Sequence, residues 1–191
     1  MESADVPVSA DKLAPMRVND YVLEYDGGVL VSEISIRRDI STFANPLRGF
    51  NGDDQWALSL APLPPGQCYA DVLEAGDYST DYIQAAGSGP DAITVEIRKP
   101  RGRQWGTDWV RYVIGHPHND DAPLDVAITL PASTQMVSRH EVFNADEAAQ
   151  LFDIYYKSAD IPPQHAPRPI EGYTTDGTII DLRDGVPRRL E

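Results

Sequence analysis

The chain has 191 residues, of which 41% are hydrophobic and 24% are charged, so it is long enough to bury one sizeable core. Thirty acidic residues against 16 basic ones give a formal net charge of −14, which opposes binding to nucleic acid or to an anionic membrane surface. A single cysteine excludes an intramolecular disulfide framework and a cysteine-based zinc finger. Because no signal-peptide pattern or long apolar run stands out, we expect a cytoplasmic protein with no nucleic-acid or membrane partner.

The N-terminal third of the chain predicts one hairpin and one long loop. Residues 1–16 show no periodicity, which predicts a mobile terminal segment followed by a single domain over residues 17–191. Alternating apolar residues flank Asp26-Gly27-Gly28, a turn whose residue types accept positive φ, and predict a β-hairpin over residues 18–36. Residues 37–54 hold several turn-forming residues and a proline, and predict a loop.

The middle of the chain predicts mainly strands. Trp56, Leu58 and Leu60 alternate as a short strand, whereas residues 68–84 fit either a short helix or two bent strands, with Gly76 opposing one uninterrupted helix. From residue 93 onward, apolar and polar residues alternate with a period of two, which is typical of an antiparallel sheet. The alternating segments cover residues 93–97, 109–114 and 124–130, with a weaker continuation at 136–141.

A capped helix is the strongest local signal in the sequence. Asn144 is a typical N-cap residue, Glu147 completes a capping box, and the apolar side chains that follow recur on one face over residues 145–158. Pro162-Pro163 ends the helix, and Ile179 to Leu182 read as a closing strand. The fold class that we predict is therefore α+β, an antiparallel β-sheet meander packed by one main C-terminal helix.

The clearest candidate for metal chemistry is the segment His116-Pro117-His118-Asn119-Asp120-Asp121, because imidazoles and carboxylates bind zinc and divalent iron. The remaining ligands would have to come from elsewhere, since the chain has no HExxH pair, and a polar hairpin turn explains the segment as well. A small hydrolase or metal-dependent enzyme using His116, His118 and the nearby acids is accordingly our alternative function.

Other patterns of catalysis or nucleic-acid binding are weaker. No GxSxG elbow, phosphate-binding glycine loop or dinucleotide fingerprint occurs, so we expect no cofactor, no metal and no enzymatic activity. The basic run from Arg98 to Arg103 precedes Trp105 and Trp109, but in an acidic chain it is better interpreted as a charged loop between two strands.

The helix and the tail resemble a known family. Residues 144–162, with an acidic start, Ala148-Ala149 and a final Tyr155-Tyr156 pair, resemble the closing part of the first immunity-protein family of bacterial polymorphic toxin systems. Residues 168–173 and 178–182 look like the final stretch of that family, and the likeness covers about residues 90–182. The resemblance implies an inhibitor that forms a one-to-one complex with a cognate secreted toxin, which is a nuclease, a deaminase or an NAD-cleaving enzyme. It implies no catalytic residues.

If the chain is such an inhibitor, an acidic surface is suited to occluding the basic active site of a toxin that acts on nucleic acids or nucleotides. The candidate contacts are loop acids without an obvious internal counter-ion, together with one helix tyrosine. These residues are Asp53, Asp54, Asp71, Glu74, Asp77, Asp81, Asp120, Asp121 and Tyr156. A scaffold or ligand-binding subunit that closes an apolar surface in a homodimer remains a third hypothesis.

Overall fold

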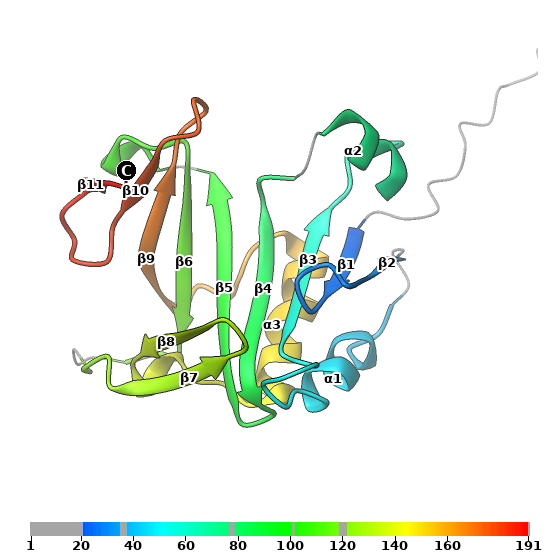
Figure 1. Ribbon diagram of the computed structural model, residues 1–191, viewed down its shortest axis with the longest axis horizontal. Coiled ribbons are helices and arrows are strands. Elements are labelled where there is room, and N and C mark those ends of the chain that lie inside the picture. Colours follow the sequence, from blue (N-terminus) through cyan, green and yellow to red (C-terminus); the bar gives the residue numbers. More distant parts are fainter. Residues whose placement is uncertain (1–20, 35–37, 77–78, 101, 119–121, 191) are drawn as a thin grey trace, which may run out of the picture.

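The computed structural model describes residues 21–34, 38–76, 79–100, 102–118 and 122–190 (Figure 1). The segment 1–16 therefore lies outside the described residues. In chain order the strands are β1 (Tyr21–Tyr25), β2 (Leu30–Ile34), β3 (Ala57–Pro62), β4 (Tyr82–Gly89), β5 (Ala92–Pro100), β6 (Trp109–Gly115), β7 (Val126–Leu130), β8 (Ser133–Val137), β9 (Ala166–Tyr173), β10 (Ile179–Asp181) and β11 (Arg188–Arg189). The helices are α1 (Ser41–Arg48), α2 (Tyr69–Ala75) and α3 (Ala145–Ser158), with short 3₁₀ turns η1 (Arg103–Trp105) and η2 (Arg139–Glu141).

Nine of these strands form one antiparallel sheet, the main sheet, in the order β11-β10-β9-β6-β5-β4-β3-β1-β2. Helices α3 and α1 cover one face of it, and the β7–β8 hairpin, residues 126–137, lies in front of the other (Figure 1). The predicted α+β class, an antiparallel meander packed by a C-terminal helix, is confirmed. We call the face turned away from α1 and α3 the open face.

The first hairpin follows its turn residues. Asp26, Gly27 and Gly28 all adopt positive φ, of 51°, 72° and 91°, and connect β1 to β2 as the sequence predicts. The Asp26 carboxylate also accepts hydrogen bonds from the backbone N–H groups of Trp56 and Ala57, at 2.8 and 3.1 Å. The turn is thereby held against the start of β3.

The prediction of a loop over residues 37–54 was wrong, because Ser41–Arg48 form α1. Phe43 and Leu47 are fully buried on the face of α1 that packs on α3, and the Phe43 ring lies 5.7 Å from that of Phe152. Pro46 lacks the N–H for one helical hydrogen bond, and this burial offsets the loss. Tertiary packing therefore overrides the local breakers.

Two further segments differ from the prediction in detail. The ambiguous residues 68–84 contain α2, which ends at Gly76 in the left-handed conformation, and the start of β4. The segment 124–130 contributes β7, which pairs with β8 in a separate two-stranded sheet and not with the main sheet. The strand predicted over residues 136–141 is confirmed only at its start, because Arg139–Glu141 form η2.

Helix α3 has the cap that the sequence predicts. The Asn144 side chain accepts from the N–H groups of Asp146 and Glu147, both at 3.0 Å, and Glu147 Oε2 accepts from Asn144 N–H at 3.1 Å. Its buried face packs on the inner residues of the main sheet, which alternate with the open-face residues along each strand. The inner residues include Leu23, Leu58, Leu60, Ile83, Ile93, Val95, Ile97 and Ile114.

The C-terminal strands complete the main sheet. The predicted closing strand is β10, and β9, which lies between β6 and β10, is a further strand that contains Pro167 and Pro169. Within β9, β10 pairs with Glu171–Tyr173, so both prolines lie in the part of β9 that is not paired with β10. A proline there removes no hydrogen bond to β10.

Candidate functional site

A row of polar side chains crosses the open face. Register pairs Glu24 of β1 with Ser59 of β3, Ser59 with Gln84 of β4, and Gln84 with Glu96 of β5. Since side chains at paired positions of neighbouring strands lie on the same face, all four project from the open face. The row continues to Arg111 of β6 and Glu171 of β9, which are again paired in register. We call these six residues the polar row.

The centre of the polar row is a buried charge with its partners. Glu96 is only 2% exposed, and its carboxylate accepts hydrogen bonds from Gln84 Nε2 at 2.6 Å and Gln135 Nε2 at 3.1 Å. Arg111 Nε lies 3.6 Å from Glu96 Oε2, and Arg111 Nη2 lies 2.9 Å from Glu171 Oε2. Burial lowers the pKa of Arg111, but the carboxylates of Glu96 and Glu171 outweigh it and raise that pKa. The centre of the row is therefore a network of compensated charges.

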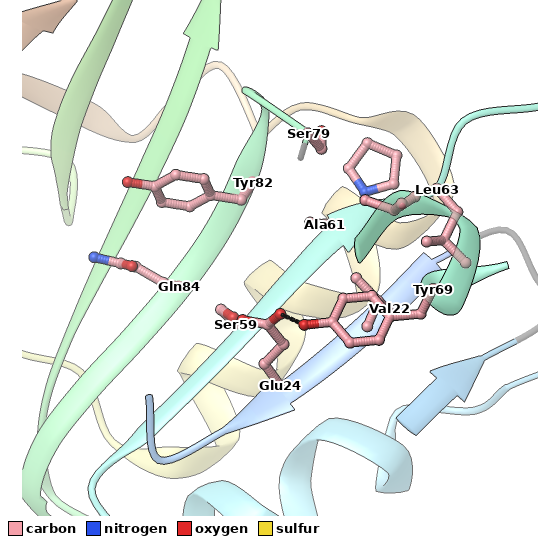
Figure 2. Close-up of a pocket in the computed structure, with 11 residues that line it drawn as sticks. Val22, Glu24, Ser59, Ala61, Leu63, Tyr69, Ser79, Tyr82 and Gln84 are labelled. Carbon is pink, nitrogen blue, oxygen red and sulfur yellow. Dashed lines mark hydrogen bonds between the residues drawn. The ribbon is translucent and has the colours of Figure 1, made fainter. Parts of the chain in front are cut away.

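At one end of the polar row lies a cleft of about 280 Å³ beneath α2, the α2 cleft (Figure 2). Ser59 and Ala61 of β3 form its floor, with Tyr69 on one side and Tyr82 on the other. Its complete lining is Val22, Glu24, Ser59, Ala61, Pro62, Leu63, Tyr69, Val72, Ser79, Tyr82 and Gln84.

Helix α2 is fastened over this cleft by its first residue. Tyr69 donates its hydroxyl to Glu24 Oε1 and its backbone N–H to Glu33 Oε1, both at 2.8 Å. Val72, the only buried residue of α2, packs in a small cluster with Val22 and Leu63. The helix therefore holds a defined position above the sheet, although it is only seven residues long.

A second cleft, of about 320 Å³, lies between the main sheet and the β7–β8 hairpin. Glu96, Arg111 and Gln135 line it together with Arg168. The Arg168 guanidinium is paired with Glu141, through Nε to Oε1 at 2.6 Å and Nη2 to Oε2 at 2.9 Å. The cations of this cleft thus already have carboxylate partners within the chain.

The structure brings only some of the predicted acidic contacts together. Asp71 and Glu74 are both exposed on α2. Asp53 and Asp54 are exposed in the α1–β3 connection, at the opposite end of β3 from α2 (Figure 1). The two pairs therefore belong to different surfaces. Asp77, Asp120 and Asp121 lie outside the described residues.

Asp81 lies at the entry to β4 and is half-buried. Burial raises its pKa, against the opposing effects of a hydrogen bond from Thr80 and the charge of Arg98. It borders a third cleft of about 390 Å³, which Lys99 and Asp160 also line. Lys99 Nζ lies 2.8 Å from Asp160 Oδ1, so charges of both signs are present there.

Tyr156, which was predicted as a contact residue, is buried in the core and does not lie on an exposed surface. The residue is 8% exposed and lies in the main core, with its ring 5.1 Å from that of Tyr21 and 5.9 Å from that of Phe43. Tyr156 packs on Phe43 of α1, and this contact could not be predicted because α1 was expected to be a loop.

The histidines of the metal hypothesis take part in local packing. His116 stacks on Phe143 at 4.3 Å, and its Nδ1 lies 3.0 Å from the backbone oxygen of His140. His118 stacks on His140 at 4.5 Å, and its Nδ1 lies 2.8 Å from the backbone oxygen of His116. Within the described residues, which exclude Asn119–Asp121, no group of three or more His, Cys, Asp or Glu side chains is arranged to hold a metal ion.

The basic run is only partly a loop. Arg98 and Lys99 belong to β5, which ends at Pro100, and the Arg98 guanidinium stacks over the Tyr173 ring at 4.0 Å. The connection that follows contains η1 before β6 begins.

Sequence reasoning missed the polar row, although one signal pointed to it. In β5, Thr94 and Glu96 alternate with Ile93, Val95 and Ile97, so the polar members share one face. A pattern within one strand does not show which polar residues of other strands complete the row.

Comparisons with protein-family models, with curated proteins and with solved structures give no match. In the part of the chain that the structure describes, no helix has both the length and the apolar character that a membrane span requires.

Proposed function

We propose that this chain is an immunity protein, which binds a cognate secreted bacterial toxin in the cytoplasm of the producing cell and occludes its active site with an acidic surface. The observation that carries the proposal is the exposed side of α2. Leu73 is 48% exposed there and lies in the same turn of α2 as Asp71 and Glu74, which are both exposed as well. An apolar anchor among charges is the arrangement that protein interfaces use.

The rigidity of α2 supports this assignment. The Asp71 carboxylate accepts a hydrogen bond from the backbone N–H of Cys68 at 2.8 Å, and this bond lowers the pKa of Asp71. The group is therefore ionised and fixed in direction at neutral pH. Together with the anchoring of Tyr69, this arrangement reduces the conformational entropy that α2 loses when a partner binds.

The charge of the whole chain supports the class of partner. At a net charge of −14, the molecule attracts a basic surface over a distance of about one Debye length, roughly 8–10 Å at physiological salt. Toxins that act on nucleic acids or nucleotides present basic active sites. Nucleases, deaminases and NAD-cleaving enzymes are thus the candidate partners, in a one-to-one complex whose association rate falls as salt is added.

The test uses, as the candidate toxin, the C-terminal domain of the protein encoded in the neighbouring reading frame. We expect the purified proteins to form a one-to-one complex, and expression of this chain to restore growth to cells that produce the toxin. The double variant Asp71→Asn, Glu74→Gln is expected to weaken the complex at least tenfold.

The matched control is Asp53→Asn, Asp54→Asn, which also removes two negative charges, from a loop at the far end of β3. It is expected to change the dissociation constant by less than about threefold, mainly through the association rate. A toxin that is neither bound nor neutralised overturns the proposal. Equal losses for the two double variants show that α2 is not the contact surface.

A further inference from the structure

The α2 cleft carries one formal charge. Glu24 is the only acidic residue among its described lining residues, and that lining contains no lysine, arginine or histidine. Glu24 Oε1 accepts from the Tyr69 hydroxyl, whereas Oε2 has no hydrogen bond within the described residues (Figure 2). A neutral or anionic occupant would leave this carboxylate desolvated without a counter-ion. A cationic occupant neutralises it.

The volume and the lining residues of the cleft indicate which kind of cation it can bind. Its volume of about 280 Å³ lies just below the range of roughly 300–1,000 Å³ that is usual for pockets of drug-sized ligands. It therefore suits a single side chain. Tyr69 and Tyr82 provide aromatic walls, and Val22, Leu63 and Val72 provide apolar surface near α2. A planar cation on a long apolar stem matches all of these features.

We propose that the α2 cleft binds one arginine side chain of the partner protein. A guanidinium donates two hydrogen bonds to a carboxylate and stacks on tyrosine rings, whereas the ammonium of lysine is a strongly hydrated point charge. Glu33, which holds the start of α2, and the exposed Asp71 and Glu74 add negative potential around the cleft. The assignment of the arginine to a toxin rests on the proposed function, but the chemistry of the cleft does not.

The direct probe is N-acetyl-arginine methylamide, titrated into the full-length isotope-labelled protein and followed by NMR. We expect saturable shifts in the amide signals of Glu24, Ser59 and Tyr82. The citrulline analogue, a neutral isostere of arginine, is expected to give no saturable shift, and the lysine analogue to bind at least threefold more weakly. Saturable binding of citrulline, or lysine binding as tightly as arginine, overturns the proposal.

Substitutions in and away from the α2 cleft test where the arginine analogue binds. Glu24→Gln removes the charge but keeps an oxygen that accepts from Tyr69, so α2 stays in place, and the affinity for the arginine analogue is expected to fall at least fivefold. Tyr82→Leu, which removes one aromatic wall, is expected to weaken binding at least twofold. Asp53→Asn removes one negative charge at the far end of β3, away from the cleft, and is expected to change the affinity less than twofold. Undiminished binding in Glu24→Gln overturns the proposal.

The test of arginine binding at the α2 cleft and the test of the immunity function can give different results. If the arginine analogue binds at the α2 cleft but the toxin domain does not bind the chain, the immunity function fails and the cleft assignment stands. If the toxin domain binds Glu24→Gln as tightly as the native chain, the cleft assignment fails and the immunity function stands.

Discussion

Gln135 donates its side-chain amide to the buried carboxylate of Glu96 over 3.1 Å, and this bond joins the β7–β8 hairpin to the main sheet. The side-chain oxygen of the same glutamine accepts from the Thr94 hydroxyl at 3.0 Å. Both partners belong to β5, about 40 residues earlier in the chain. A single amide thus satisfies two polar groups of the open face, and it positions the hairpin over the centre of the polar row.

Replacing Gln135 with Leu is therefore expected to destabilise the fold. Glu96 loses one of its hydrogen-bond donors while it stays buried, and the loss of a hydrogen bond to a charged group costs about 1.5–3 kcal/mol. Urea unfolding measures the free energy of unfolding directly. Thr134→Ala, at an exposed position of the same hairpin, is the control and is expected to change it by less than about 0.5 kcal/mol. Equal stability of Gln135→Leu and the native chain contradicts this account.

The ion pair between Arg168 and Glu141 predicts that the losses of stability caused by the two single substitutions do not add when both residues are replaced. Glu141 is 4% exposed and also accepts a hydrogen bond from Ser138 N–H at 2.9 Å. Arg168→Leu leaves its carboxylate buried without a counter-ion, which costs about 3 kcal/mol. Combining Arg168→Leu with Glu141→Gln removes that charge, so the double variant is expected to be more stable than Arg168→Leu alone. A double variant that loses the sum of both single losses contradicts the prediction.

Sequence patterns predicted the structure correctly where local signals and tertiary packing favour the same conformation. The capping box at Asn144 and the turn at Asp26 both need only residues that lie close together in the chain, and both are confirmed. Helix α1 shows the limit, since Pro46 and its neighbours favour a loop locally, and the burial of Phe43 and Leu47 against α3 decides otherwise.

The polar row could not be predicted from the sequence, because it depends on how the strands pair. Each member of the polar row is an ordinary polar residue in its own strand, and register alone brings Gln84 to Glu96 and Arg111 to Glu171. The acids chosen from the sequence were expected to lie in loops, and their positions depend on where each segment lies in the fold. Asp71 and Glu74 lie close together because residues 69–75 form α2, one of the two structures that the sequence left open.

Burial of Tyr156 predicts a loss of stability and not of a partner contact. Tyr156→Ala leaves a cavity between Tyr21 and Phe43, and loss of a large aromatic side chain from a core costs about 3–5 kcal/mol. Gln150→Ala, on the exposed side of the same helix, is expected to cost less than about 0.5 kcal/mol. Thermal unfolding of the two variants distinguishes a core position from a surface one. A Tyr156→Ala variant as stable as Gln150→Ala places the side chain outside the core.

The pH dependence of stability is expected to include a contribution from His165. Burial lowers the pKa of His165 below its ordinary value of 6.5, and the charge of His116 acts in the same direction. The folded state therefore binds this proton less readily than the unfolded chain does. Stability from this group is complete above pH 6.5, and it is lost as the pH falls from about 6.5 toward the lower pKa of the folded state.

His165→Gln isolates this contribution, because glutamine is polar and does not titrate. At pH 7.5 the variant lacks only the packing of the imidazole, whose ring lies 6.3 Å from that of Phe143. As the pH falls to 5.5, the native chain loses the stability linked to the neutral imidazole and the variant does not. The difference in the free energy of unfolding between the two proteins, measured in urea at pH 7.5, 6.5 and 5.5, is therefore expected to narrow. A difference that stays constant or widens shows that the pKa of His165 is not lowered by folding.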